Sequence, residues 1–119
     1  MADELLNLQI VRELLAVEAK SSTPFMGGLL EAFAGEARAA LERMRACARA
    51  GDAERLAREA HRLKGSSGSL GAARLSGECL ALERSARAGR CDALEAHIDR
   101  ALRVLDDSHR RMAEHFSRR

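Results

Sequence analysis

The sequence of 119 residues contains no tryptophan and no tyrosine, and its aromatic content is 3%. A core built from it must use leucine, alanine, valine, isoleucine and methionine, and a composition rich in alanine and leucine favours helices. Few aromatic rings are available to stack on bases. The net charge is +2, with arginine mixed among glutamate and aspartate along the chain, so no nucleic-acid-binding face is predicted.

Cysteines and long hydrophobic runs are also scarce. Cys47, Cys79 and Cys91 are odd in number and lack Cys-x-x-Cys spacing, so neither a disulfide framework nor a metal site is predicted. Cys47 and Cys79 fall on apolar stripes and are expected in the core, whereas Cys91 is expected near the surface. No run is long enough to span a bilayer, and the N-terminus is acidic where a secretory signal would be basic. We therefore expect a cytoplasmic protein without a membrane segment.

The spacing of apolar residues and the capping signals predict five helices in a single domain of residues 1–119. Short connections force the four long helices to pack antiparallel. The predicted fold is all-α, an antiparallel up-down four-helix bundle with an additional short N-terminal helix. The expected helices run from Asp3 or Glu4 to Glu18, with Asp3 as cap; from Thr23-Pro24 to Ala50; from an Asp52 cap to Leu70; through Leu75 and Ala86 to a stop at Gly89; and from near Asp92 to Phe116.

One of the four histidines has unusual neighbours. On a helix, the residues beside His61 are Lys64, Gly65 and Gly68. Each glycine costs about 1 kcal/mol relative to alanine inside a helix, and close approach of a partner would explain that cost. The charge of Lys64 can meet phosphoryl oxygens, and it favours the neutral, nucleophilic form of the imidazole. The apolar stripe of this helix excludes His61, so its side chain is predicted to point outward.

The run from Ala60 to Leu75, continued to Leu82-Glu83, resembles the histidine-containing phosphotransfer (HPt) domain of bacterial phosphorelays, whose pattern is roughly AHxLKGxSxxxGAxxL followed by C and LE. Every position of the pattern is present, and a weaker resemblance extends back to about Leu29. The resemblance implies a helical bundle in which His61 accepts a phosphoryl group reversibly from the phospho-aspartate of a receiver domain. It implies a phosphotransfer protein without an ATP-binding or kinase domain, rather than an enzyme.

Roles for the residues around the acceptor follow from the same resemblance. Lys64 would stabilise the phosphoryl group, and Gly65 and Gly68 would leave room for the receiver's active-site loops. Arg58 and Arg62 would steer an acidic receiver surface, although residues of a solvated face are the alternative reading for both.

Two further motif residues are predicted to be structural. Ser67 faces inward and is expected to pack there or to bond to a backbone carbonyl of its helix. Gly71 is expected to serve a turn that needs a positive φ or a close helix approach.

The implied partners are receiver domains and a hybrid sensor histidine kinase. No cofactor is expected on this chain, Mg²⁺ is expected on the receiver, and the chain is expected to be a monomer. The alternative function is a non-phosphorylated helical adaptor that binds a receiver or a sensor kinase. Of the other histidines, His97 is expected in solvent, His109 as a half-buried spacer and His115 in a basic C-terminal turn.

Overall fold

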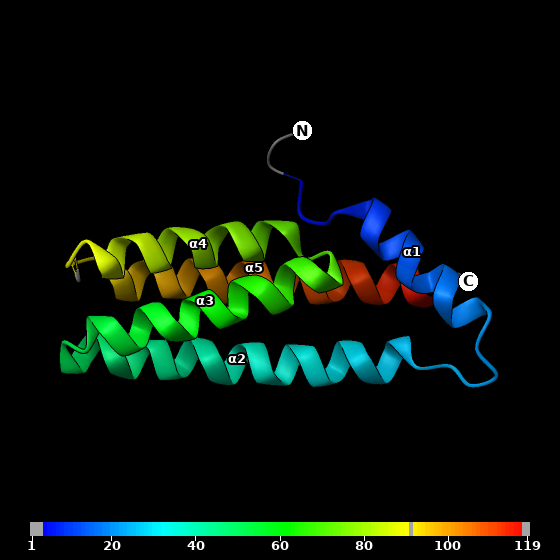
Figure 1. Cartoon of the computed structure of the whole chain (residues 1–119), viewed down its shortest axis with the longest axis horizontal. Helices are drawn as coiled ribbons and strands as arrows, with labels where there is room; N and C mark the ends of the chain where they lie inside the picture. Colours follow the sequence, from blue (N-terminus) through cyan, green and yellow to red (C-terminus); the bar gives the residue numbers. More distant parts are fainter. Residues whose placement is uncertain (1–3, 91, 118–119) are drawn as a thin grey trace.

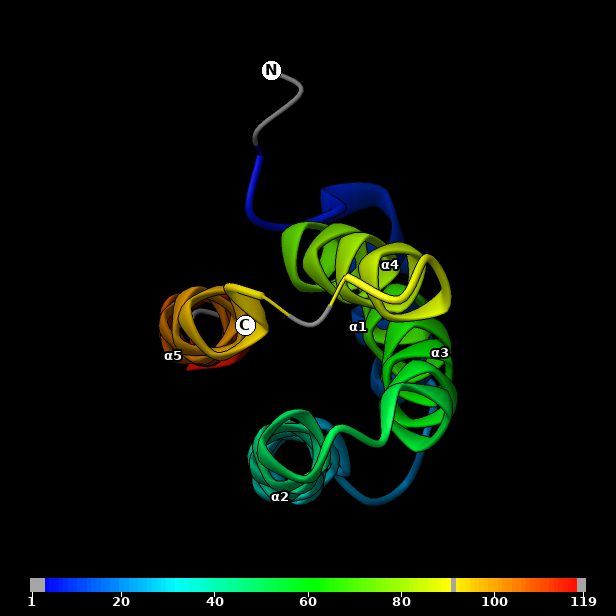
Figure 2. The same ribbon diagram turned by 90° about the vertical axis from the view of Figure 1, so that its left-hand side faces the viewer.

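The computed structural model describes residues 4–90 and 92–117, which form five α-helices joined by short connections (Figure 1). The helices are α1 (Leu8–Ala19), α2 (Met26–Ala50), α3 (Ala53–Leu70), α4 (Ala73–Arg87) and α5 (Leu94–Ser117). Seen end-on, α2, α3, α4 and α5 run alongside one another around a shared interior (Figure 2). The expected bundle of four long helices with a shorter N-terminal helix is confirmed.

The junction between α2 and α3 follows the local sequence. Gly51 ends α2 with a φ of 72°, a left-handed conformation that glycine adopts without steric cost. The Asp52 side chain then accepts a hydrogen bond from the backbone N–H of Arg55 at 3.1 Å, which caps α3. Both features were predicted, because they depend only on neighbouring residues.

Gly71 ends α3 with a φ of 88° and also allows a close approach. A Cβ atom built there would lie 3.1 Å from the carbonyl oxygen of Asn7 and from Cγ2 of Val11. The Gly71 carbonyl accepts a hydrogen bond from the backbone N–H of Asn7 at 2.8 Å. Gly71 therefore serves the turn and also holds the N-terminal segment against the bundle.

The predicted starts of the first and second helices were wrong, and the fifth helix begins close to the expected residue. The first helix begins at Leu8, with Asn7 as its cap, and the predicted cap Asp3 lies outside the described residues. The fifth helix begins at Leu94, two residues after the expected Asp92. The second begins at Met26 instead of Pro24.

The late start of α2 has a tertiary cause. The Glu18 carboxylate at the end of α1 accepts hydrogen bonds from the backbone N–H groups of Phe25 and Met26, both at 2.7 Å. It satisfies donors that would otherwise be orphaned at the helix start, and its charge suits the positive end of the helix dipole. A carboxylate from another helix therefore replaces the cap expected from Thr23.

Buried side chains gather in two clusters. The larger is contributed mainly by α2, α3, α4 and α5, and the smaller joins the N-terminal segment and α1 to the start of α2 and the end of α5. Cys47 and Cys79 are buried as predicted, and burial raises the pKa of the Cys79 thiol to about 12. Cys91 lies outside the described residues. Across the described chain, no helix has the length and apolar character needed to cross a membrane.

Candidate functional site

His61 lies on the outer side of α3, with 60% of its side chain exposed. The neighbouring residues Ala60 and Leu63 are buried, so they turn α3 with its apolar side inward and the imidazole outward. The outward orientation predicted for His61 is confirmed.

The imidazole is held by a carboxylate of the next helix. His61 Nδ1 lies 3.1 Å from Oε2 and 3.3 Å from Oε1 of Glu83, which belongs to α4 and is 8% exposed. Glu83 was quoted as part of the motif, but no role was predicted for it. The sequence could have indicated this contact, because His61 lies ten residues before the turn glycine Gly71 and Glu83 lies twelve residues after it. Near-equal arms of an antiparallel helix pair place the two side chains opposite each other.

Glu83 also gathers two cations. Lys64 Nζ lies 3.6 Å from its Oε1, and Arg87 contacts its Oε2 through Nη2 at 3.0 Å and Nε at 3.1 Å. Burial acts to raise the pKa of Glu83, but the hydrogen bonds from Arg87 and His61 outweigh it and leave the pKa below its ordinary value. Glu83 is therefore an anion at neutral pH.

An ionised carboxylate can only accept hydrogen bonds, so the Nδ1 atom of His61 must be the donor. In the neutral ring, the lone pair then resides on Nε2. The exposure of the side chain leaves this nitrogen open to a partner. The arrangement therefore prepares His61 as an Nε2 nucleophile, with Glu83 able to stabilise the positive charge that develops on the ring during attack.

The two glycines beside His61 face different surroundings. Gly65 is exposed, and a Cβ atom built there would meet no other atom within 4 Å. Gly68 is half-buried, and its Cβ would lie 3.5 Å from the hydroxyl oxygen of Ser76 on α4. Gly65 thus leaves the outer surface free of a side chain beside His61, whereas Gly68 lies at the contact between α3 and α4. Their roles toward a partner stay predictions.

Comparison with known proteins gives a clear assignment. The sequence profile of the Hpt domain matches residues 28–114. The chain belongs to the Hpt domain family. This Hpt domain is also similar in structure to histidine-containing phosphotransfer protein B (HptB) from Pseudomonas aeruginosa PAO1, with 29% identity and a TM-score of 0.84 over 97% of this chain and 96% of the other. Comparison with curated protein sequences gives no significant match.

These findings confirm the resemblance noted in the sequence and its class of function. The Hpt family acts in histidine phosphotransfer within phosphorelays, as a shuttle and not as a catalytic kinase, and it interacts with receiver domains and histidine kinases. The profile match covers nearly all of α2 and the whole of α3 and α4, which carry His61, Lys64 and Glu83.

The two arginines near His61, Arg58 and Arg62, are exposed on α3. Arg58 Nη1 lies 2.9 Å from Glu54 Oε1, and Arg62 Nη2 lies 3.6 Å from Glu59 Oε2. The pair of Arg58 is a weak surface pair, whereas Arg62 lies at the edge of the buried Glu59 with its own side chain 73% exposed, so both guanidinium groups remain accessible to a partner. Their predicted role in steering a receiver stays a prediction.

Ser67 is fully buried on the inner side of α3, as predicted. Among the described residues, no group forms a hydrogen bond with its hydroxyl oxygen. Of the two alternatives given for Ser67, inward packing is therefore the one observed.

The expectation that His97 lies in solvent was wrong. Its side chain is 12% exposed, and Nε2 lies 2.8 Å from Oε1 of Glu78, so it bridges α5 to α4. His109 is half-buried as expected, and its Nε2 lies 2.6 Å from Glu31 Oε2 on α2. Three of the four histidines therefore pair with a glutamate of another helix, but His61 is the most exposed of these three. Within the described residues, no group of three metal-binding side chains comes together.

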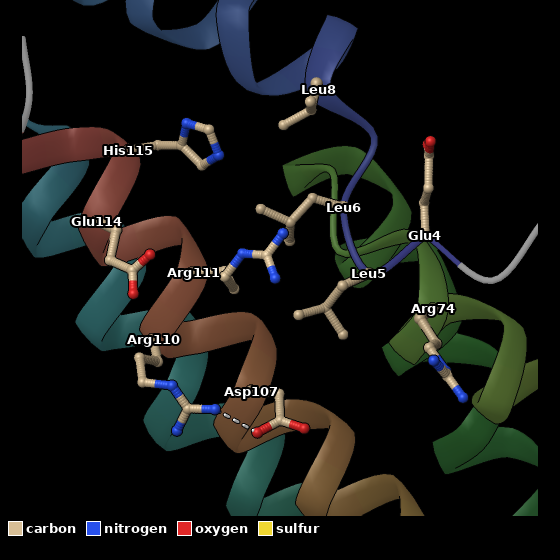
Figure 3. A pocket seen from close by; sticks show the side chains of 10 residues that line it. All are labelled: Glu4, Leu5, Leu6, Leu8, Arg74, Asp107, Arg110, Arg111, Glu114 and His115. Carbon is tan, nitrogen blue, oxygen red and sulfur yellow. Dashed lines mark hydrogen bonds and ion pairs between the residues drawn. The ribbon is translucent and has the colours of Figure 1, made fainter. Parts of the chain in front are cut away.

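One cavity is separate from the His61 site. It has a volume of about 780 Å³ and lies between the N-terminal segment, the start of α4 and the C-terminal half of α5 (Figure 3). None of its lining residues belongs to α3. Acidic and basic side chains are mixed around it, and Arg110 pairs with Asp107 there. The mixed lining therefore does not form a surface of a single charge sign.

Proposed function

We propose that Nε2 of His61 accepts a phosphoryl group from the phospho-aspartate of a receiver domain and passes it reversibly to another receiver. The observation that carries this proposal is an exposed imidazole whose Nδ1 is bound by the ionised carboxylate of Glu83. Such a ring presents its lone pair to a partner, which distinguishes it from the partly buried pairs at His97 and His109.

The proposed transfer requires few catalytic groups from this chain. The Nε2 lone pair attacks phosphorus in line, the bond from phosphorus to the aspartyl oxygen breaks, and that oxygen leaves as carboxylate. The proton on Nδ1 stays hydrogen-bonded to Glu83 throughout, which stabilises the cationic ring of the product. In the reverse direction, the same protonated ring is a good leaving group, so one arrangement serves both directions of transfer.

The residues around His61 complete the proposed site. Lys64, one turn along α3, would move from Glu83 towards the phosphoryl oxygens, since its ammonium group is on a flexible stem. Gly65 would give the receiver's loops close access to Nε2. We expect Mg²⁺ to arrive with the receiver, while this chain supplies the nucleophile, the cation and the clearance.

We expect the partners to be receiver domains and a hybrid sensor kinase that carries one. The docking face would include Gly65 and Arg58, which lie within about one turn of His61 on its exposed side, and it would extend to Arg62, which is exposed next to His61. A single acceptor on one outer face fits a monomer that meets one receiver at a time.

The test is transfer of labelled phosphate from a panel of phosphorylated receiver domains to the parent chain and to His61→Gln. We expect acid-labile, alkali-stable label on the parent and none on the variant. A parent chain that binds a receiver but takes up no label would overturn the proposal and favour the adaptor.

A further inference from the structure

A serine hydroxyl crosses the contact between α3 and α4 close to the acceptor. Ser76 is half-buried on α4, and its Oγ donates a hydrogen bond to the backbone carbonyl oxygen of Lys64 at 3.0 Å. The other serine hydroxyls that bond near here, those of Ser66 and Ser69, stay within α3. Ser76 therefore provides a direct hydrogen bond from α4 to the α3 backbone one turn beyond His61.

Gly68 leaves the space that this bond needs. A Cβ atom at Gly68 would already be in van der Waals contact with Ser76 Oγ, at 3.5 Å. A longer side chain at this position would push the hydroxyl away from the Lys64 carbonyl. The pairing of a glycine with a serine thus sets how closely α3 and α4 approach here.

The same spacing governs the hydrogen bond at the acceptor. Ser76 and Glu83 are seven residues apart on α4, so they lie on the same helix face, about 10 Å apart along the axis. His61 Nδ1 is 3.1 Å from Glu83, and hydrogen bonds are lost once the separation exceeds about 3.5 Å. A small increase in the distance between α3 and α4 would therefore break the hydrogen bond between His61 Nδ1 and Glu83.

We propose that Ser76 is a positioning residue that fixes the spacing of α3 and α4 and thereby holds Glu83 on Nδ1 of His61, with Gly68 as its required neighbour. The consequence for transfer rests on the proposed function, whereas the consequence for the imidazole does not.

The experiment compares Ser76→Ala with Ser69→Ala, which removes a hydroxyl bonded at 3.0 Å to the Gly65 carbonyl within α3. Nitrogen-15 NMR of the neutral His61 ring reports which nitrogen carries the proton. Phosphoramidate, a small phosphoryl donor, measures the reactivity of His61 without a receiver.

Ser76→Ala should shift the proton from Nδ1 towards a mixture of tautomers. It should also slow phosphorylation about threefold to tenfold, the range expected for one lost hydrogen bond. Ser69→Ala should change neither the tautomer nor the phosphorylation rate, and Ser76→Thr, which keeps a hydroxyl, should retain the tautomer and the rate of the parent.

If Ser76→Ala fails to fold, a second pair of variants tests the positioning role of Ser76. Gly68→Leu should displace the Ser76 hydroxyl and reproduce the tautomer shift, whereas Gly65→Leu, which enters open space, should leave the tautomer unchanged. Parent-like tautomers in folded Ser76→Ala or Gly68→Leu would overturn the inference. If the parent takes no phosphate from any donor but its tautomer still responds to Ser76, the proposed function fails and the positioning role stands.

Discussion

Two buried glutamates, one on α3 and one on α4, pair with basic side chains to different effect. Glu59 lies within α3 and binds Arg43 of α2 through Nε at 3.0 Å and Nη2 at 3.1 Å. Glu83 reaches α3 from α4 and binds His61. They are 4% and 8% exposed, respectively. A guanidinium stays protonated, so the pair with Arg43 can only hold two helices together. An imidazole can keep one proton and offer its other nitrogen, so the pair with Glu83 creates a nucleophile.

The largest expected difference is in reactivity. Glu83→Ala removes the acceptor for the Nδ1 proton, and hydrogen bonds to charged groups contribute about 1.5–3 kcal/mol, so His61 phosphorylation by phosphoramidate should slow by about tenfold to a hundredfold. Glu83→Gln should lose less, because its amide oxygen can still accept from Nδ1.

The control is Glu59→Ala, which removes the same side chain from the other side of α3. Its initial phosphorylation rate should match that of the parent under native conditions. Equal losses in the two variants would mean that neither glutamate acts specifically on His61.

The free energy of unfolding should fall more in Glu59→Ala than in Glu83→Ala. Glu59→Ala leaves Arg43 with Glu36 alone, at 2.9 Å, and removes a two-point link between α2 and α3. We expect the free energy of unfolding to fall by about 1–3 kcal/mol, measured by urea denaturation. Glu83→Ala should cost less, because the His61 and Arg87 side chains are more than half exposed and regain water. A larger loss in Glu83→Ala would mean that its pairs are chiefly structural.

Lys64 belongs to the Glu83 pair alone, since its Nζ lies 3.6 Å from Glu83 Oε1. Lys64→Ala should slow transfer from a receiver severalfold and shorten the lifetime of phosphohistidine, since a cation near the phosphoryl oxygens is lost. The nucleophile remains, so labelling should still occur. Unchanged transfer and lifetime, measured with labelled phosphate, would remove the electrostatic role assigned to Lys64.

The smallest expected effect is on the acid side of the stability curve. Hydrogen bonds from Arg43, outweighing burial, lower the pKa of Glu59, and the pKa of Glu83 is also lowered. Both groups therefore stabilise the fold fully above the ordinary glutamate pKa of 4.5, and that contribution is lost as the pH falls through the folded-state values. In Glu59→Gln, the decline below pH 4.5 should be shallower than in the parent. Parallel curves from urea titrations would contradict this assignment.

The sequence predicted those parts of the molecule that depend on near neighbours. The periodic apolar stripes predicted the helices and the outward orientation of His61. Gly51 and Asp52 predicted the junction between α2 and α3, because each residue has a strong local preference for a helix end or a helix cap. His61 could be singled out as the candidate acceptor because its helix neighbours are a lysine and two glycines.

Apart from the exact starts of α1 and α5, the missed features depend on contacts between helices. Glu18 caps α2 from α1, and His97 is covered by its pair with Glu78. The partner of His61 and the surroundings of Gly68 are likewise set by the approach of α4. Helical spacing identifies which residues share a face, but it cannot say which of those residues the next helix will cover.

The most direct test of phosphorylation at Nε2 is phosphorus–nitrogen NMR on the phosphorylated, nitrogen-15-labelled chain. We expect phosphorus to be coupled to Nε2 of His61, while Nδ1 retains its proton and its hydrogen bond to Glu83. Phosphate on Nδ1, or on a residue other than His61, would contradict this expectation.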